Sequence, residues 1–358
     1  MRGTEHMGSD GATGASPVRV AVDAMGGDYG PRETVKGALE ALGAHNIELL
    51  LVGDGDRVKA ELAHYDLAGK PVTVIPSVDK IGDDEHPIHA LRAKPKASIL
   101  VATQLLKSGD ADVLVSMGPT GASMASAVLL LGMMEGLERP CLGGPFLGMG
   151  PRTVLVDMGT NVDCRPSLLV SFAALGAVFA RSFLDIENPR IGLLSVGAEE
   201  AKGNRQVQEC YQLLRDSHLN FIGNVEGMDF FNGRADVIVC DGFVGNILMK
   251  FTEGLGAALA PFLEERLSSV LAPEELGGVS SDIWRATNLP RIMGGPLWGV
   301  DGAVVLGHGS CKSAEVAGAI DTAVRYVEIG LVESMRQELS QLSAADGDRS
   351  ASKLKADS

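Results

Sequence analysis

The stretch VRVAVDAMGGDYGPRETVKGALEAL, residues 18–42, contains one complete α/β unit. Residues 18–22 are mostly β-branched or apolar, a composition that favours a buried strand. Gly26 and Gly27 then permit a tight turn. From Pro31 the apolar residues recur at helical spacing as far as Leu42, and proline is favoured at the start of a helix. The stretch therefore predicts a strand that enters a helix through a polar, glycine-containing turn.

An apolar run followed by such a turn recurs six more times, without a fixed period. The six segments are IELLLVGDGD (47–56), ADVLVSMGPTGA (111–122), TVLVDMGTNVD (153–163), IGLLSVGAEEAKGN (191–204), ADVIVCDGFVGN (235–246) and GAVVLGHGS (302–310). Continuous apolar strands that alternate with helices are typical of a parallel sheet covered on both faces. We therefore predict an α/β fold with three layers, α/β/α, around a mostly parallel, doubly wound sheet.

The composition along the chain divides it into three segments. Residues 1–17 and 341–358 are small, polar and unpatterned, so we expect both to be disordered tails. Residues 18–340 form a single α/β catalytic domain in this interpretation. Within it, residues 255–291 read as a helical excursion, with breaks at Pro273 and at Gly277–Gly278. This excursion could dock a partner, form a dimer arm, rest on a membrane surface or pack on its own domain.

Charge and cysteine content exclude several classes of protein. Lys plus Arg is 31 against 46 for Asp plus Glu, a net charge of −15, which argues against general nucleic-acid binding. Five widely spaced cysteines without a CxxC pair fit neither a disulfide framework nor a zinc ribbon, and predict reduced thiols in a cytoplasmic protein. Residues 113–134 carry no charge, but their Gly turn favours a strand and a buried helix over a membrane span.

The polar turns predict where a ligand binds. In open α/β sheets, ligands bind beyond the carboxyl ends of the strands, where backbone N–H groups and helix N-termini favour anions. Single Gly and Asp residues are also ordinary turn and cap residues, but so many such turns together favour an anionic ligand. Lys202 and His308 each lie in a glycine-containing turn, where they could assist chemistry or simply be structural. Arg92, Lys94 and Lys96 could bind phosphate or an acidic partner, or form a solvated basic face.

Other motifs are missing or weak. The sequence has no P-loop, no GxGxxG fingerprint, no HExxH and no GxSxG elbow. His86 and His89 lie near three acidic residues, but the acidic residues before Pro87 fit a helix start better than a metal site. We expect neither a metal nor a cofactor.

Eight segments resemble the PlsX family, the bacterial phosphate acyltransferases of phospholipid synthesis, in order from about Val18 to Leu331. They are VAVDAMGGDYGP (20–31), ALRAKPKAS (90–98), VSMGPTGA (115–122), LVDMGTNVDCRP (155–166), LLSVGAEEAKGN (193–204), NFIGNVEGMD (220–229), VIVCDGFVGNILMKFTEG (237–254) and VVLGHGS (304–310). The chain departs from the family pattern at Pro119, where Asn is usual, and at Thr160, which precedes Asn161 in place of Ala. Pro119 removes a backbone donor and a side-chain amide from its turn.

The resemblance implies transfer of a long-chain fatty acyl group from acyl carrier protein to inorganic phosphate, giving acyl-phosphate for phospholipid synthesis. It also implies a fold akin to phosphotransacetylase and isopropylmalate dehydrogenase, a homodimer, and transient attachment of a cytoplasmic protein to the inner membrane face. A phosphotransacetylase-like transferase that uses a small acyl-CoA is the alternative. Phosphate is the nucleophile in such a reaction, so no serine or cysteine nucleophile is needed.

The residues and the resemblance together give a hypothesis for the site. We predict that Lys202 and Asn161 stabilise the oxyanion, that His308 assists the leaving thiolate, and that Asn204 belongs with these catalytic residues. The predicted phosphate- and substrate-binding residues are Asp23, Gly26, Gly27, Asp28, Arg92, Lys96, Ser116, Thr120, Gly121, Asp157, Asp241, Gly242 and Asn246.

Overall fold

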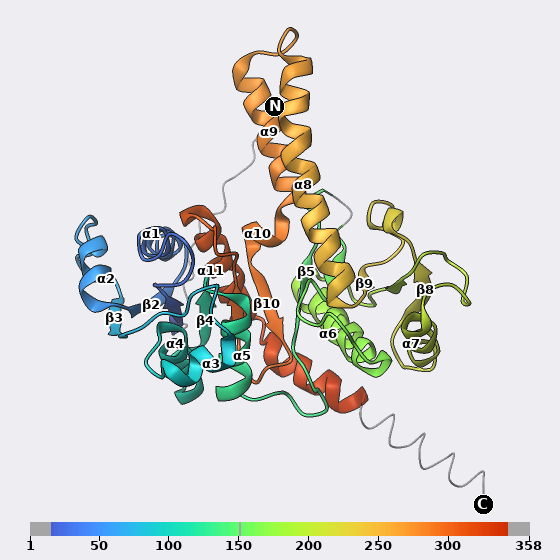
Figure 1. Ribbon diagram of the computed structural model, residues 1–358, viewed down its shortest axis with the longest axis horizontal. Coiled ribbons are helices and arrows are strands. Elements are labelled where there is room, and N and C mark those ends of the chain that lie inside the picture. The colour runs from blue at the N-terminus through green and yellow to red at the C-terminus, as the bar shows by residue number, and fades with distance from the viewer. Residues whose placement is uncertain (1–15, 150–151, 343–358) are drawn as a thin grey trace, which may run out of the picture.

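The computed structural model describes residues 16–149 and 152–342, which form an α/β fold around one eleven-stranded sheet (Figure 1). The strands are β1 Val18–Asp23, β2 Ile47–Gly53, β3 Val72–Pro76, β4 Val113–Ser116, β5 Cys141–Pro145, β6 Val154–Val156, β7 Ile191–Leu194, β8 Phe221–Val225, β9 Val237–Val239, β10 Gly295–Trp298 and β11 Val304–Leu306. The helices are α1 Arg32–Leu42, α2 Gly55–Leu62, α3 Pro87–Ala93, α4 Ser98–Ser108, α5 Thr120–Leu130, α6 Pro166–Leu184, α7 Arg205–Arg215, α8 Gly242–Leu267, α9 Pro273–Thr287, α10 Leu289–Met293 and α11 Ser313–Glu328, with a 3₁₀ turn at Gly227–Phe230.

The sheet has two parallel blocks joined by an antiparallel centre. The strand order is β3-β2-β1-β4-β11-β10-β5-β6-β9-β7-β8. Strands β3 to β11 pair in parallel, as do β6 to β8, whereas β10 and β5 pair antiparallel with each other and with their outer neighbours. The prediction of a mostly parallel sheet is thus confirmed. The antiparallel centre was not predicted.

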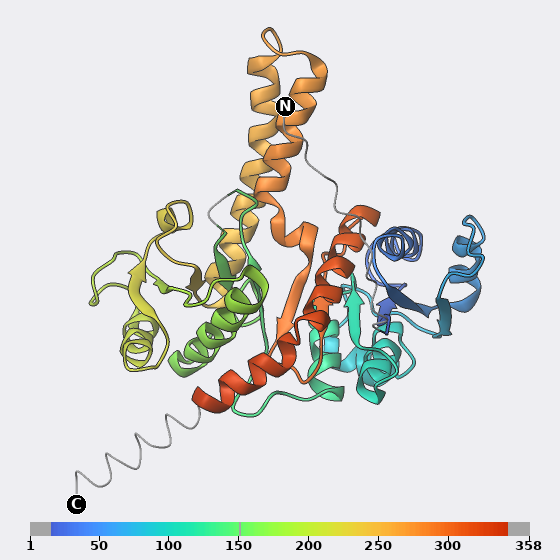
Figure 2. The ribbon, with the colours of Figure 1, turned by 180° about the vertical axis from the view of Figure 1, so that it is seen from behind.

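Helices cover both faces of the sheet, which confirms the predicted three layers (Figure 2). One face carries a continuous core, in which Val20, Val156 and Val239 pack with residues of α1, α6 and α11. The other face carries two separate cores. One lies with α4 and α5, and the other, around Leu155 and Ile238, packs against the first turns of α8.

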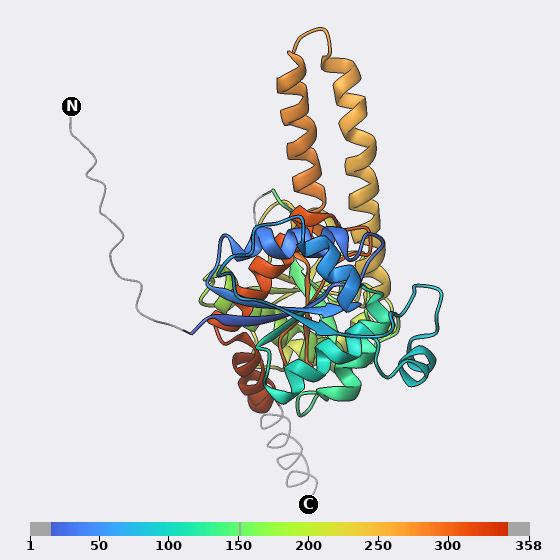
Figure 3. The ribbon, with the colours of Figure 1, turned by 90° about the vertical axis from the view of Figure 1, so that its left-hand side faces the viewer.

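The predicted helical excursion is a long hairpin of α8 and α9 that projects from the body of the protein (Figure 3). Helix α8 already begins at Gly242, and α9 begins at Pro273 as predicted. The predicted break at Gly277–Gly278 is wrong, because both glycines lie inside α9. Glycine weakens a helix by only about 1 kcal/mol, which packing against a neighbouring helix can offset.

The segment 113–134 forms β4, a turn and α5, as expected. Among the described residues, α6 is the one helix long and apolar enough to cross a membrane, and most of it is buried within the fold. The two predicted tails lie outside the described residues except at 16–17 and 341–342. Residues 331–342 are helical, so the ordered part of the chain extends past the predicted boundary at 340.

Candidate active site

Three of the predicted turns meet where β1, β4 and β11 end, because these strands are neighbours in the sheet. The N–H of Asp28 donates to the carbonyl of Gly309 at 2.8 Å. Gly27 has φ of +80°, and a Cβ there would lie 2.8 Å from that same oxygen. A Cβ on Gly26 would lie 2.7 Å from the nitrogen of Gly118. Glycine is therefore required at both positions for the turns to approach each other.

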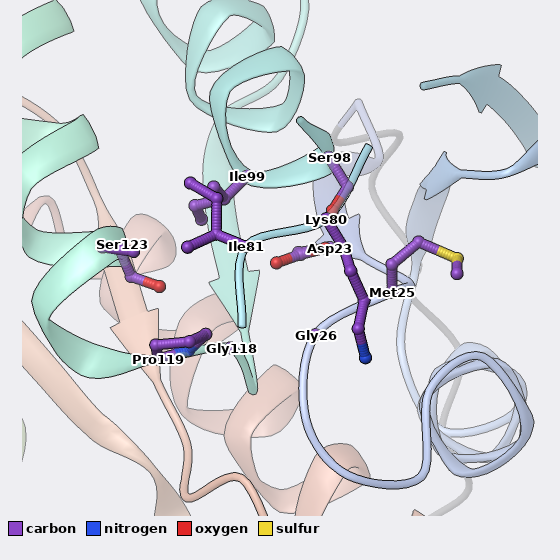
Figure 4. Close-up of a pocket in the computed structure, with 11 residues that line it drawn as sticks. Asp23, Met25, Gly26, Lys80, Ile81, Ser98, Ile99, Gly118, Pro119 and Ser123 are labelled. Atoms are coloured by element: carbon purple, nitrogen blue, oxygen red, sulfur yellow. The ribbon is translucent and has the colours of Figure 1, made fainter. Parts of the chain in front are cut away.

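A small pocket lies among these turns; we call it the polar pocket. Its lining comes from β1, the segment before α3, and the N-terminal turns of α4 and α5. The lining residues are Asp23, Met25, Gly26, Lys80, Ile81, Ser98, Ile99, Gly118, Pro119, Ala122 and Ser123. Figure 4 shows Asp23 at its centre, close to Ser98 and Lys80, with Ser123 on the opposite wall. Two helix N-termini and a lysine make this pocket suitable for an anion.

Asp23 is the buried ionisable group of the polar pocket, only 3% exposed. Its Oδ2 accepts a hydrogen bond of 2.9 Å from the Ser116 hydroxyl, whereas its Oδ1 has no hydrogen-bond partner. Burial raises the pKa of Asp23, although nearby hydroxyls and backbone N–H groups oppose this shift. A buried carboxyl in this position favours its neutral form.

Most backbone donors around the polar pocket already have acceptors. Gly26 N–H donates to the carbonyl of Asp23, and Gly118 N–H donates to the Ser116 hydroxyl. Ser123 N–H donates to the carbonyl of Pro119, which itself has no N–H. Because the N–H groups of Gly26 and Gly118 are engaged, an anion in this pocket would depend on side-chain donors and on the two helix N-termini.

A second group of predicted residues surrounds the turn after β6. The Asp157 carboxylate is fully buried and accepts hydrogen bonds on both oxygens. The donors are the backbone N–H groups of Leu142, Gly159, Thr160 and Asn161, the Thr160 hydroxyl and the Asn161 amide. Burial raises the pKa of Asp157, and the donors from Thr160 and Asn161 oppose that shift. Asp157 thus holds the turn in shape.

Asn161 contributes to the same turn through both hydrogens of its side-chain amide. Its Nδ2 donates to the carbonyl of Pro140 at 2.7 Å and to Asp157 at 2.9 Å. Asp241 caps α8 by accepting from Val244 N–H, and Gly242 N–H donates to the carbonyl of Asn161 at 2.7 Å. These residues fix the start of α8 against the turn after β6. Asn246, one turn further along α8, packs beside Gly159.

A larger pocket, with an empty volume of about 530 Å³, lies where residues of the two blocks meet; we call it the apolar pocket. Gly307 and His308, which follow β11, and Met158, which follows β6, line this one space. Its lining residues are Thr120, Leu142, Met158, Met249, Glu253, Pro290, Arg291, Gly295, Leu306, Gly307 and His308. The pocket lies between the two cores on that face of the sheet, and its apolar lining with a few polar groups is typical in composition of a ligand site.

His308 is the predicted catalytic residue that lines the apolar pocket. Its Nδ1 lies 2.8 Å from the Ser310 hydroxyl and accepts from Ser310 N–H at 3.3 Å, which assigns the ring proton to Nε2. Burial, together with Lys250 and Arg291, lowers the pKa of His308. The imidazole is therefore neutral at pH 7 and offers an N–H donor. Arg291 is held by Glu315 at 2.5 Å and by the carbonyl of Ser310 at 3.0 Å.

Four further predicted residues, Lys202, Asn204, Arg92 and Lys96, line neither pocket. Lys202 is exposed in the loop after β7, and Asn204 caps α7 by accepting from Val207 N–H. Arg92 and Lys96 are exposed. Lys96 lies two residues before Ser98 of the polar pocket, and its carbonyl accepts from Val78 N–H.

Sequence reasoning missed Lys80, Ser98 and Ser123, which line the polar pocket. Lys80 reaches it because Asp79 forms an isolated bridge with Ala97, a long-range pairing without a sequence signal. Ser98 and Ser123 lie at or near the start of a helix. That position, after a predicted turn, is the sequence feature that could have identified them.

The cysteines offer no nucleophile at this site. All five are buried. Burial is the main cause that raises the pKa of Cys164 and Cys210 to about 12 and that of Cys311 to about 11, so these thiols stay protonated at neutral pH.

The sequence matches the family model described as fatty acid synthesis protein over residues 18–334. Among curated proteins, it is 41% identical over 325 residues to the phosphate acyltransferase of Desulforamulus reducens, covering 90% of this chain and 97% of that protein. It is 42% identical over 333 residues to the phosphate acyltransferase of Pelotomaculum thermopropionicum, covering 91% and 96%.

Among solved structures, the fold resembles a phosphotransacetylase from Streptococcus pyogenes, with a TM-score of 0.59 and 19% identity over 87% of this chain and 94% of that one. It also resembles a branched-chain phosphotransacylase from Enterococcus faecalis, with a TM-score of 0.53 and 16% identity over 87% and 99%. At these identities the likeness concerns the fold alone, and it confirms the predicted fold class.

Proposed function

The chain belongs to the family of fatty acid synthesis proteins, and on this premise we propose that it is a phosphate acyltransferase that transfers a long-chain acyl group from acyl carrier protein to inorganic phosphate. An oxygen of hydrogen phosphate attacks the thioester carbonyl, and the carbon–sulfur bond breaks. The phosphate proton ends on the released thiol of the carrier protein. The other product is an acyl-phosphate, which can serve phospholipid synthesis.

This proposal rests on one observation: two pockets lie on either side of a single turn. Gly118 and Pro119 line the polar pocket, and Thr120 lines the apolar pocket. An anion and a hydrocarbon chain need opposite surroundings, because each loses free energy in the environment that suits the other. The turn at residues 118–120 separates two such environments within three residues. We place phosphate in the polar pocket and the acyl end of the thioester in the apolar pocket.

The protein's contribution in this mechanism is positioning and electrostatic stabilisation. Holding phosphate against the carbonyl carbon can supply roughly 7–11 kcal/mol, and each well-placed donor to the oxyanion roughly 3–4 kcal/mol. His308 Nε2–H is our candidate donor at the apolar pocket. Lys202 and Asn204 stay predictions as catalytic residues. We expect Asn161 to shape the turn after β6, since both of its amide hydrogens are engaged.

The acyl chain would contact the wall of the apolar pocket that is formed by Met158, Met249, Leu142 and Leu306. Methionine side chains are flexible and adapt to irregular apolar surfaces, so a range of chain lengths can be accommodated. This wall favours a long-chain acyl group over the small-acyl alternative. The likeness to phosphotransacetylases does not bear on that choice, because it concerns the fold.

Carrier protein would dock beside these pockets on a local basic surface, since the chain as a whole is acidic. We assign this role to Arg92 and Lys96, which are exposed and belong to the segment that leads into α4 at the polar pocket. Lys94, the third cation of that segment, is excluded because it pairs with Glu85 at 2.6 Å.

A homodimer is part of this proposal, with α8 as the contact surface. Phe243, Ile247, Phe251 and Leu255 are each about half exposed or more, and they recur every four residues, so they share one face of the helix. A second copy would cover this face.

Transient contact of a cytoplasmic protein with the inner membrane face remains a proposal. The acidic residues Glu264, Glu265, Glu274 and Glu275 near the end of the hairpin weaken binding to anionic lipid.

The test compares two acyl donors, palmitoyl carrier protein and acetyl-CoA, each with and without inorganic phosphate. We expect thiol release from palmitoyl carrier protein only when phosphate is present. Turnover of acetyl-CoA without turnover of palmitoyl carrier protein would instead assign the small-acyl reaction. Thiol release that does not depend on phosphate would refute both.

A further inference from the structure

The side chains of the polar pocket carry too little positive charge to hold both a phosphate dianion and an ionised Asp23. We therefore ask whether Asp23 carries a proton. Lys80 supplies one positive charge, and Ser98 and Ser123 supply neutral hydroxyls. The backbone N–H groups of Gly26 and Gly118 are already engaged. An ionised Asp23 would place a buried negative charge beside the anion with no counter-charge of its own.

Two buried aspartates in this protein differ in the number of hydrogen bonds that their carboxyl groups accept. Asp157 accepts hydrogen bonds on both oxygens, from donors on four residues. Asp23, which lines the polar pocket, accepts one on Oδ2 from Ser116, while its buried Oδ1 has no hydrogen-bond partner. A buried oxygen without a partner costs free energy unless a ligand or a proton satisfies it.

From this geometry we infer that Asp23 binds phosphate as a neutral carboxylic acid, donating a hydrogen bond from Oδ1 to a phosphate oxygen. The inference rests on the proposed function, because it takes phosphate to be the occupant of the polar pocket. Oδ2 continues to accept from Ser116, so the proton resides on the oxygen that lacks a partner. Burial already raises the pKa of Asp23, and a bound anion would raise it further.

The groups that face Asp23 come from four elements and are consistent with this protonation state. Ser116 lies at the end of β4, Ser98 at the start of α4 and Ser123 in α5, and all three are neutral. Lys80, from the segment before α3, is the cation of the pocket lining. It offsets part of the phosphate charge, and no ion pair between Lys80 and Asp23 occurs within residues 16–149 and 152–342.

Asparagine at position 23 would offer the same hydrogen-bond acceptor and donor as a neutral aspartic acid. Its carbonyl oxygen can accept from Ser116, and its NH₂ group can donate where Oδ1 of the acid would donate. An ionised aspartate would behave differently toward two anions of similar size. It could accept a hydrogen bond from the P–OH group of hydrogen phosphate, but it would repel sulfate, which has no such proton at neutral pH.

The experiment is calorimetric titration of the full chain with inorganic phosphate and with sulfate at pH 7.5, without acyl donor. We expect wild type to bind both anions, with dissociation constants within about fivefold of each other. Asp23→Asn should bind phosphate within about threefold of wild type, and Asp23→Ala at least about tenfold more weakly, since a charge-assisted hydrogen bond is lost. Asp66→Asn, at an exposed position on the same half of the sheet, is the control.

Three results would overturn the inference. The first is that wild type rejects sulfate while Asp23→Asn accepts it. The second is that Asp23→Asn weakens phosphate binding as much as Asp23→Ala does. The third is that wild type does not bind phosphate. If the variants fail to fold, the comparison of phosphate with sulfate on wild type decides the question.

A parallel acyl-transfer assay separates this inference from the proposed function. Phosphate-dependent transfer together with rejection of sulfate would refute only the neutral acid. Binding as expected, without transfer from any thioester, would refute the proposed reaction and leave the protonated Asp23 in place.

Discussion

His308 is a neutral donor because of its burial and three neighbours. Burial, together with Lys250 and Arg291, disfavours the charged ring and lowers its pKa, and Ser310 holds Nδ1. We predict that His308→Ala lowers kcat by about 10²–10³-fold, the usual effect of losing one oxyanion donor. His308→Gln keeps an N–H near the position of Nε2 and should stay within about tenfold of wild type. Steady-state assays of both variants with the same acyl donor measure this difference.

The pH profile of wild-type kcat gives an independent check on His308. Because its pKa lies below the usual value near 6.5, the ring should not titrate between pH 7 and 8. An ionisation in that range that disappears in His308→Gln would contradict the assignment. Equal losses in the alanine and glutamine variants would also contradict it.

Asp23 should make the stability of the protein depend on pH. The folded-state pKa is raised above the unfolded value of 3.8, so the stabilising contribution is complete below that value and is lost as pH rises through the folded pKa. The free energy of unfolding of wild type should therefore fall across this range relative to that of Asp23→Asn. Urea unfolding of both proteins at several pH values between 4 and 9 tests the prediction. A constant difference between them across that range would refute it.

At the scale of elements, the α8–α9 hairpin depends on one close approach between its helices. A Cβ on Gly256 would lie 2.0 Å from the Thr287 hydroxyl, whereas a Cβ on Gly254 would meet nothing within 4 Å. Gly254→Ala should raise the free energy of unfolding by about 0.5–1 kcal/mol, because alanine favours helix. Gly256→Ala should lower it by about 1–3 kcal/mol through overpacking. Thermal unfolding of the two variants is the measurement, and a gain in stability for Gly256→Ala would show that the hairpin is packed differently.

The exposed face of α8 makes a prediction about assembly. Phe251 is 66% exposed at the middle of the apolar series from Phe243 to Leu255. If a second copy covers this face, Phe251→Glu should shift the protein from dimer to monomer, because the charge would be buried without a partner. Light scattering after size-exclusion chromatography gives the mass directly. Lys250→Glu, a charge change one residue away on the same helix, is a control for the general effect of added charge. An unchanged dimer mass for Phe251→Glu would refute the assignment of this face.

At the scale of the whole molecule, the local units were predictable from the sequence because they depend on residues that are close in the chain. The run of residues 18–42 forms β1, its turn and α1 as expected. The same holds for the segment from β4 to α5, where apolar residues and a Gly turn decide the structure. The meeting of the turns at Gly26, Gly118 and Gly309 followed from the rule for parallel strands.

What the sequence did not predict depends on pairings between distant segments. The antiparallel strands β10 and β5 lie at the centre of the sheet and bring Met158 and His308 to one pocket. Lys80 enters the polar pocket through the bridge between Asp79 and Ala97. The position of Lys202, exposed in its loop, likewise depends on where β7 lies in the sheet. Spacing along the chain carries no information about such neighbours.

The central claim is that phosphate, held in the polar pocket, is the nucleophile that receives the acyl group. The most direct measurement is mass spectrometry of the products after incubating the protein with palmitoyl carrier protein and phosphate fully labelled with ¹⁸O. The account predicts palmitoyl phosphate that retains all four labelled oxygens, together with free carrier-protein thiol. Unlabelled palmitic acid as the sole acyl product would mean that water attacks the thioester, and would contradict the account.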